Sequence, residues 1–275
     1  MPNSNEYQTK RLVHLAKNTQ GNDYVVGDLH GCIRQLYTAL TQLNFDPSRD
    51  RLISVGDLVD RGIDNLMALK LINEPWFYAV LGNHEVMHLN QDFDHAVSNG
   101  MDWALRFVRD KAKNQPTLDD QTPVYFELLE AFKRFPIAYE IETEHGLMVV
   151  LHAEVTPVIQ EWSLARDLIE AVKDHQLCKS DFLWGRKRYQ VISSYFDPDE
   201  YVDGVTYIFT GHTPVNQPTW HGNHLNIDTG LVFGILGRMD LNEEPALTFV
   251  NLTQLKQYRF PVKYGDVLDF VVEDL

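Results

Sequence analysis

The sequence predicts an α/β fold, because short strand-like runs alternate with segments of helical periodicity in the first half of the chain. The runs are rich in Val, Ile, Leu, Tyr and Phe, and Gly or His follows each within two residues, as is typical of buried strands. They lie at residues 24–26, 52–55, 77–81, 147–151 and 205–209. A chain of 275 residues can form one α/β core, so we expect a single domain over residues 1–275.

Apolar residues at helical spacing predict the intervening helices. They recur from Ile33 to Leu43, from Ile63 to Leu71 and from Leu164 to Val172, where we expect Ser163 to be the N-cap. Between residues 86 and about 135 the pattern changes, and a polar stretch, KAKNQPTLDDQTP, precedes a further helical pattern. We expect a helical insertion with a loop there.

After residue 205 the chain returns to strand-like runs. These are HLNID, GLVFGIL, ALTFVNL and DVLDFVV. Their composition favours strands in antiparallel pairing. Residues 238–275 match no motif, and we treat them as a C-terminal extension without an assigned role.

Composition indicates a folded protein and excludes some partners. Hydrophobic residues make up 44% and charged residues 23% of the chain. The 24 basic and 39 acidic residues give a net charge of -15, which argues against binding to nucleic acid or to an anionic membrane. Two cysteines, Cys32 and Cys178, are too few for a disulfide framework, although one bridge is possible. With no signal-like or membrane-spanning segment, we expect a cytoplasmic protein.

Each of the five buried runs ends on a polar cluster. The clusters are YVVGDLHG, LISVGDLVDRG, FYAVLGNHE, LMVVLHAE and YIFTGHT. Because strand ends gather at one edge of an α/β sheet, we expect these side chains to converge. The candidate metal ligands are Asp28, His30, Asp57, Asn83, His152 and His212.

The ligand types predict a centre of two divalent cations. Asp57 is the candidate bridge, since a dinuclear catalytic centre usually shares a carboxylate. Asp28 and His30 would hold the first cation with it, and Asn83 and two histidines, His152 and His212, would hold the second. Mixed Asp, Asn and His ligation suits Mn²⁺, our first choice, or Fe or Zn²⁺ better than Ca²⁺ or a structural zinc. Each residue alone could merely cap a turn, but six at strand ends favour a metal site.

These clusters resemble the motifs of the phosphoprotein phosphatase family of metallophosphoesterases. The blocks GDLHG, GDLVDRG, GNHE, HAE and TGHT occur in that order within residues 27–213. NGMDW at 99–103, LWGR at 183–186 and IDTG at 227–230 are most similar to the compact bacterial and phage lambda-type branch. The resemblance implies a calcineurin-like two-sheet β-sandwich flanked by helices, with catalytic motifs at 27–230, and the same six metal ligands.

The resemblance also implies a mechanism and its residues. A metal-bound hydroxide would attack the phosphorus of a phosphoserine or phosphothreonine monoester, with phosphotyrosine and small phosphoesters as further candidates. His84 matches the general acid, and Asp60 matches the carboxylate that orients it. Arg61, Arg186 and Asn83 match positions that bind the substrate phosphate. For Arg186, a surface salt bridge is the alternative.

One departure from the family pattern keeps other functions open. Many members carry Arg immediately before GNH, where this chain has Leu81. An apolar residue there also occurs in related bacterial diadenosine tetraphosphatases, which are the alternative assignment. Those enzymes typically read GNHD and lack the equivalent of Asp60, so Asp60 and Glu85 favour a protein phosphatase. A non-catalytic binding scaffold is the third hypothesis, although no ligand and no proton donor is missing.

Several other residues were weighed for chemistry. Cys178 precedes KSDFLWGR, whose spacing excludes a cysteine-dependent phosphatase. Asp228 in IDTG is expected to orient a ligand without being one. Trp103 could border the substrate groove or pack in the core. We expect the remaining histidines to have ordinary surface or packing roles. They are His14, His88, His95, His145, His175, His221 and His224.

Overall fold

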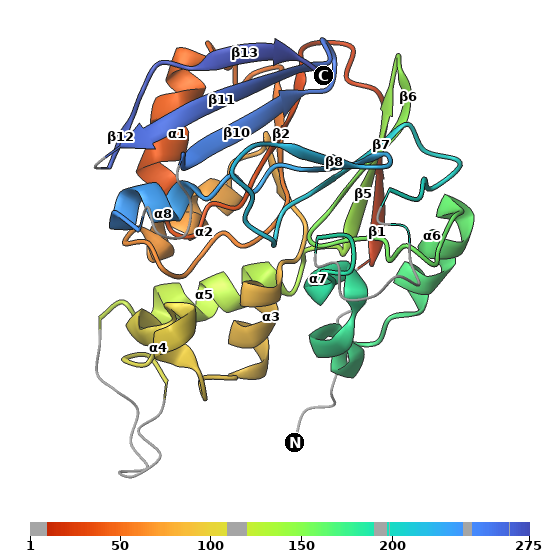
Figure 1. The fold of residues 1–275 in the computed structure, drawn as a ribbon. Coiled ribbons are helices and arrows are strands. Elements are labelled where there is room, and N and C mark those ends of the chain that lie inside the picture. Colours follow the sequence, from red (N-terminus) through yellow and green to blue (C-terminus); the bar gives the residue numbers. More distant parts are fainter. Residues whose placement is uncertain (1–9, 109–119, 190–196, 198, 239–243, 264) are drawn as a thin grey trace.

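The computed structural model describes residues 10–275 apart from 109–119, 190–196, 198, 239–243 and 264. Two mixed β-sheets pack together, and helices flank them (Figure 1). This confirms the predicted α/β fold with two sheets. Most of the polar stretch KAKNQPTLDDQTP, predicted as a loop, lies outside the described residues.

One sheet has the strand order β12-β11-β10-β2-β3-β4, with β13 paired to β11. Its strands are β2 (Asp23–Val26), β3 (Arg51–Ser54), β4 (Phe77–Ala79), β10 (Ala246–Asn251), β11 (Lys256–Lys263), β12 (Asp266–Val267) and β13 (Val271–Asp274). The other sheet has the order β1-β5-β6-β7-β9-β8. Its strands are β1 (Leu12–Leu15), β5 (Ala138–Thr143), β6 (Gly146–Leu151), β7 (Tyr207–Thr210), β8 (Thr219–His221) and β9 (His224–Asn226).

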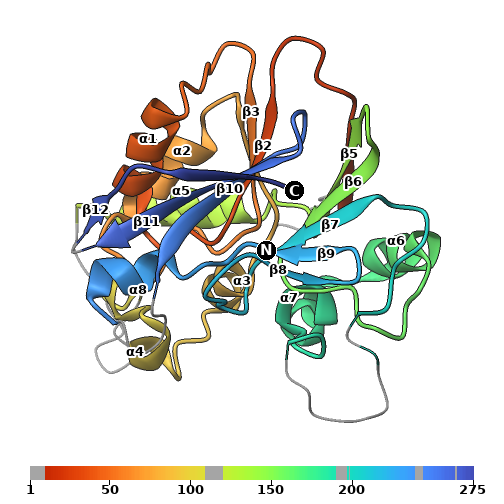
Figure 2. The same ribbon diagram turned by 45° about the horizontal axis from the view of Figure 1, so that its top comes forward.

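The helices divide between the two sheets. Figures 1 and 2 show α1, α2 and α8 beside the sheet of β10 and β11, and α6 and α7 beside the sheet of β6 and β7. The α-helices are α1 (Ile33–Gln42), α2 (Ala68–Ile72), α3 (Asn83–Asn90), α4 (Ala96–Asn99), α5 (Thr122–Phe132), α6 (Trp162–Ala171), α7 (Asp181–Trp184) and α8 (Leu231–Leu236). Short 3₁₀ turns are η1 (Asn65–Met67), η2 (Asp102–Ala104) and η3 (Asp174–Lys179). Within the described parts of the chain, no helix is long and apolar enough to cross a membrane.

Two local predictions were wrong. GLVFGIL, predicted as a strand, forms α8, which packs on β10 and β11 and ends at Gly237 in the left-handed conformation, with φ 66°. A short apolar run fits a strand or a buried helical turn equally well. Ser163 is not the N-cap of α6, because the helix begins at Trp162 with Glu161 as N-cap, two residues earlier than predicted. Glu161 forms a β-bridge with Asp203, and this tertiary contact fixes the start of the helix.

Strands β10 to β13, which lie in the predicted C-terminal extension, complete a sheet. β10 lies between β2 and β11 and is antiparallel to both, with Val250 beside Val25. Phe249 and Val250 are fully buried. The extension to which no role was assigned therefore contributes to the core. Cys32 is buried and Cys178 exposed, and no disulfide joins them, so the bridge left open by the sequence does not form.

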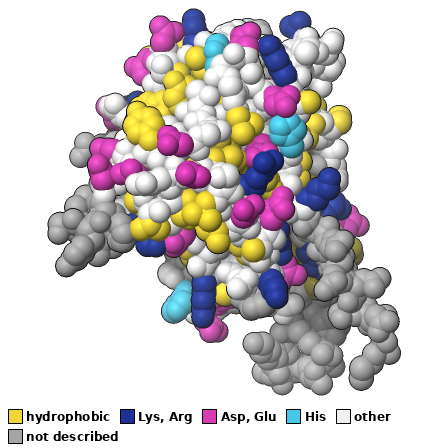
Figure 3. All heavy atoms as spheres, turned by 90° about the vertical axis from the view of Figure 1, so that its right-hand side faces the viewer, with side chains coloured by type: hydrophobic (Ala, Val, Ile, Leu, Met, Phe, Trp, Pro, Cys, Tyr) yellow, Lys and Arg dark blue, Asp and Glu magenta, His cyan; other side chains and the backbone are white. Residues whose placement is uncertain are grey.

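The face that carries β6 and α6 has a mixed charge pattern. Figure 3 shows basic and acidic side chains interspersed on this side of the molecule. Arg166 forms an ion pair with the buried Glu140, at 2.9 Å, and His14 Nε2 lies 3.0 Å from Glu142 Oε1. The net negative charge of the chain is therefore not concentrated on this face.

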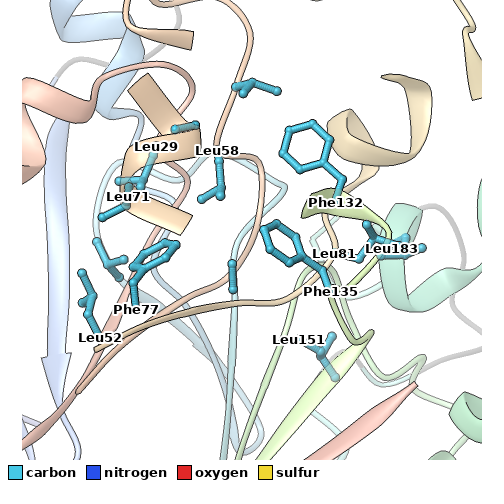
Figure 4. Packing of buried hydrophobic residues seen from close by; sticks show 14 of the residues in the cluster. Leu29, Leu52, Leu58, Leu71, Phe77, Leu81, Phe132, Phe135, Leu151 and Leu183 are labelled. Atoms are coloured by element: carbon cyan, nitrogen blue, oxygen red, sulfur yellow. The ribbon is translucent and has the colours of Figure 1, made fainter. Parts of the chain in front are cut away.

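Hydrophobic residues form a core between the sheets and a second one under the helices. The first contains Val25, Ile53, Val150 and Phe209, which come from strands of both sheets. In the second, Leu81 packs with Phe132, Phe135 and Leu183 (Figure 4), where it lines a cavity of about 190 Å³. Only 2% of Leu81 is exposed. Packing thus explains an apolar residue at this position.

Leu81→Ala should lower the free energy of unfolding by about 2–5 kcal/mol, because it enlarges a cavity in a packed core. Urea unfolding of the two proteins measures the difference. Leu164→Ala is the matched control, since Leu164 is 49% exposed on α6 and should change stability by no more than about 0.5 kcal/mol. Equal effects of both substitutions would contradict the packing role of Leu81.

Candidate metal centre

The candidate ligands follow strands whose carboxyl ends meet. β2, β3 and β4 are parallel neighbours. Asp28 and Asp57 lie in the loops after β2 and β3, and Asn83 begins the helix α3 that follows β4. In the other sheet β6 and β7 are parallel neighbours and precede His152 and His212. Each sheet therefore presents ligands at its carboxyl edge, as the sequence predicts.

Two buried triads of potential ligand atoms share one residue. They are His30, Asp57 and His84, and Asp57, His152 and His212; within each triad the ligand atoms lie within 4.8 Å of one another. Asp57 Oδ2 lies 3.6 Å from His30 Nε2, and Asp57 Oδ1 lies 3.4 Å from His152 Nε2. The two oxygens of Asp57 thus face different triads, an arrangement that fits a dinuclear metal site.

Asn83 lies inside the second triad. Its Oδ1 is 2.8 Å from His152 Nε2 and 2.8 Å from His212 Nδ1. Asn83 is the first residue of α3, and the next backbone N–H, that of His84, donates to Asp57 Oδ1 at 3.0 Å. The start of α3 therefore brings an amide oxygen to the imidazoles and holds the shared carboxylate.

Asp28 joins the two sheets but belongs to neither triad. Its Oδ2 is 3.9 Å from His30 Nε2, and both oxygens accept from the backbone N–H of His212, at 3.2 and 3.3 Å. A Cβ on Gly211 would lie 2.0 Å from Asp28 Oδ1, so only glycine permits this close approach. Asp28 is thus held against the loop that follows β7.

The site has the charge and the donor atoms that divalent cations require. Burial, then the carboxylates of Asp228 and Asp57, raises the pKa of Asp28 well above its usual range. Burial also raises the pKa of Asp228 to about 6. These buried carboxylates repel one another unless a cation lies among them.

The imidazoles are in the form that binds metal. Burial lowers the pKa of His30, His152 and His212, so the rings are neutral. His212 Nε2 is buried without a hydrogen-bond partner. Oxygen and imidazole donors without thiolate fit Mn²⁺, Fe or Zn²⁺.

His84 and Asp60 form a buried pair beside the first triad. His84 Nδ1 and Asp60 Oδ2 are 2.5 Å apart, and His84 Nε2 lies 3.9 Å from Asp57 Oδ2. Burial alone would raise the pKa of Asp60, but the charges and hydrogen bonds of His88 and His84 lower it to about 2. Asp60 is therefore ionised and accepts from His84 Nδ1–H, which leaves Nε2 facing the triad.

Two arginines approach the site, Arg61 from the segment after β3 and Arg186 from the segment after α7. Arg61 Nη1 contacts His30 Nε2, and Arg61 Nη2 is 3.2 Å from His84 Nε2. Arg186 donates to Thr213 Oγ1 and to the carbonyl oxygen of His212, each at 3.4 Å. Neither bond of Arg186 is to a carboxylate, so these contacts do not match the surface salt bridge weighed as its alternative.

Backbone strain is concentrated at this site. Eight residues other than glycine have positive φ among those that the structure describes, and five of them lie here. These are His30 (43°), Asp57 (50°), Asp60 (78°), Arg61 (66°) and His212 (67°). Strained conformations of this kind persist where surrounding contacts fix the backbone, which is common at functional sites.

Glu85 supports the site in a way that the sequence analysis did not predict. Its fully buried carboxylate accepts from the backbone N–H groups of Gly82 (2.9 Å), Asp57 (3.0 Å) and Leu58 (2.8 Å). Burial, then the Asp57 carboxylate, raises the pKa of Glu85 to about 8, while the three donors act in the opposite direction. A Glu three residues after a helix N-cap is a known capping signal and could have indicated this contact.

His88 and Trp103 also reach the site. His88, to which the sequence analysis assigned a surface or packing role, is fully buried, and its Nε2 lies 2.8 Å from Asp60 Oδ1. Trp103 Nε1 donates to the same oxygen at 2.7 Å. The spacing of His88, four residues after His84 on one helix, could have indicated a shared partner.

Glu85→Gln should lower the free energy of unfolding by about 1–3 kcal/mol, because the amide NH₂ replaces an acceptor and leaves a buried backbone N–H without a partner. Thermal and urea unfolding would measure this. Glu127→Gln, on the exposed side of α5, is the control and should be neutral. Unchanged stability of Glu85→Gln would show that the three hydrogen bonds contribute nothing measurable.

Comparisons with known proteins agree with this geometry. Residues 24–216 match the family model for calcineurin-like phosphoesterases. Serine/threonine-protein phosphatase 1 of Salmonella typhimurium is 34% identical over 215 residues, which cover 77% of this chain and 87% of that protein. A symmetrical bis(5'-nucleosyl)-tetraphosphatase of Vibrio campbellii is 35% identical over 162 residues, 56% of this chain and 53% of that protein. A solved structure provisionally assigned as a diadenosine tetraphosphatase has the same fold, with a TM-score of 0.59, 20% identity, and coverage of 92% of this chain and 98% of that one.

Proposed function

The chain belongs to the calcineurin-like phosphoesterase family, and we propose that it is a protein phosphatase acting on phosphoserine and phosphothreonine. The observation that carries this proposal is the buried His84–Asp60 pair beside the two triads. The alkoxide leaving group of serine or threonine is strongly basic, so its departure requires a proton donor. His84 Nε2 is available for that role because Asp60 holds Nδ1.

We assign the metal ligands around Asp57, whose carboxylate is shared by the two triads. Asp28, His30 and Asp57 would hold one cation, and Asp57 with Asn83, His152 and His212 would hold the other. His84, although it belongs to a triad, is assigned to proton donation because Asp60 accepts from its other nitrogen. Two divalent cations, for which Mn²⁺ is our first choice, would neutralise phosphate charge and activate water here.

The chain's own side chains would bind and orient the phosphate. Arg61 lies beside His30 and His84, and Arg186 lies beside His212, so the two guanidinium groups lie beside different triads. A planar guanidinium can bind two phosphate oxygens at once. Asn83 could contribute its amide N–H, because Oδ1 faces His152 and His212. Phosphate held in this way would present its leaving oxygen to His84 Nε2.

The alternative substrate is diadenosine tetraphosphate. A tetraphosphatase relative matches 56% of the chain, whereas the Salmonella protein phosphatase matches 77%. Asp60 and Glu85, both fully buried in contact with the site, also favour the protein phosphatase. Leu81 carries less weight for the alternative, because it packs in the hydrophobic core. A binding scaffold without activity is the hypothesis of a different class.

The substrate assignment predicts that protein stripped of metal and reloaded with Mn²⁺ dephosphorylates phosphoserine and phosphothreonine peptides faster than it cleaves diadenosine tetraphosphate. Release of inorganic phosphate and chromatography of nucleotides would measure both reactions in parallel. Asp57→Asn should lower turnover of every substrate by about 100-fold or more, since it removes the charge shared by two cations. Preferential cleavage of the dinucleotide would favour the tetraphosphatase, and no turnover of any phosphoester would favour the scaffold.

The role of His84 predicts a dependence on the leaving group. His84→Asn should lower kcat on a phosphoserine peptide by about 10²–10⁴-fold, but much less on p-nitrophenyl phosphate, whose leaving group needs little protonation. His95→Asn is the control, because His95 is exposed and makes no side-chain cap bond at α4. Equal losses on both substrates would rule out proton donation by His84.

A further inference from the structure

Asp60 accepts hydrogen bonds from three side chains, only one of which the proposed chemistry uses. His84 Nδ1 lies 2.5 Å from Oδ2. On the other oxygen, Oδ1, His88 Nε2 lies at 2.8 Å and Trp103 Nε1 at 2.7 Å. Asp60 itself is fully buried. One carboxylate oxygen of Asp60 therefore contacts His84, and the other contacts His88 and Trp103, which lie in the helical insertion.

His88 has a hydrogen-bond partner at each of its two ring nitrogens. Because Asp60 is ionised, His88 donates its Nε2–H to Oδ1. His88 Nδ1 lies 3.1 Å from the hydroxyl of Tyr125. Burial raises the pKa of Tyr125 above its usual value, so the hydroxyl keeps its proton and forms a neutral hydrogen bond with Nδ1. His88 is thus held at both nitrogens, and the chain of hydrogen bonds runs from Tyr125 through His88 and Asp60 to His84.

Three elements of the insertion enclose this chain of hydrogen bonds. His88 is on α3, Trp103 on η2 and Tyr125 on α5. The ring of His88 lies 5.4 Å from that of Trp103 and 5.9 Å from that of Tyr125, and Phe107 stacks on Tyr125 at 5.0 Å. His88 and Tyr125 are fully buried. The contacts leave the Asp60 carboxylate little freedom to rotate.

We propose that His88, Trp103 and Tyr125 are positioning residues that fix Asp60, and through it His84, and that this is a function of the helical insertion. The donors His88 and Trp103 on Oδ1 fix the orientation of the Asp60 carboxylate, so that its Oδ2 lies within hydrogen-bond distance of His84 Nδ1. Outer partners of this kind determine how a functional side chain is presented. The inference rests on the proposed function, because it concerns how the proton donor is oriented.

The test compares His88→Leu with His88→Gln. Leucine fills similar space but donates nothing, whereas the amide nitrogen of glutamine can lie near the position of Nε2 and donate to Asp60. With Mn²⁺ present, His88→Leu should lower kcat on a phosphoserine peptide by about 10–100-fold, with KM within about threefold because phosphate binding is unchanged. The loss on p-nitrophenyl phosphate should be smaller than about threefold, since that leaving group needs little protonation. His88→Gln should recover most of the lost kcat.

Tyr125→Phe extends the test without removing a ring from the core. It deletes only the hydroxyl that is hydrogen-bonded to His88, and we expect a loss of about 3–10-fold in kcat that is again confined to the phosphoserine peptide. Phe126→Leu, at the neighbouring and half-exposed position of α5, is the control and should keep wild-type kcat. If circular dichroism shows that His88→Leu does not fold, Tyr125→Phe decides the question alone.

The outcomes separate this inference from the proposed function. Wild-type protein that cleaves no phosphoester would contradict the function and the inference together. Active wild-type protein, combined with wild-type kcat in folded His88→Leu or in Tyr125→Phe, would overturn only the positioning role. Equal losses on both substrates would overturn it too, because they would reflect a general disturbance of the centre.

Discussion

Negative charge buried where the carboxyl ends of two sheets meet is the constraint on which this structure depends. Asp28, Asp57 and Asp228 are all buried there, and each accepts at least one backbone N–H, from His212, His84 and Gly230 respectively. Such bonds reduce the cost of burying carboxylates but do not neutralise them. Divalent cations would do so. The close approach of Gly211 to Asp28 and the positive φ values at the ligands follow from bringing these loops together.

Helix α3 connects this charged centre to the proton-donating pair. Its first turn supplies Asn83 to the imidazoles and the N–H of His84 to Asp57, while Glu85 holds the loop after β3 through the N–H groups of Asp57 and Leu58. One turn later, His88 reaches the same carboxylate as His84. A strained backbone can persist here because several independent contacts fix each loop. Damage to α3 should therefore affect metal binding and proton donation together.

The sequence predicted the strands and site residues that are marked by a pattern of neighbouring residues. β2, β3, β6 and β7 are short apolar runs because they are buried on both faces, and the polar residues after them marked the site. β5 was missed because Glu140 interrupts its apolar pattern. This buried carboxylate is tolerated because Trp162 and Arg166, on α6, donate to it. The partnership of His88 was missed for a similar reason, since it depends on side chains of separate elements that no local pattern connects.

Because position 81 is a leucine and not an arginine, the proposed phosphate binding depends on how the two sheets meet. In the proposed function, two arginines bind the phosphate, Arg61 from the loop after β3 and Arg186 from the end of α7, and Leu81 packs in the core without contributing a third. The distance between the two guanidinium groups then depends on how the sheets meet. Both oxygens of Asp28 accept from His212 across that junction, and Arg186 donates to the carbonyl of the same residue. Through His212, the contact that joins the sheets also positions one of the two phosphate-binding groups, so metal binding and phosphate binding depend on the same junction.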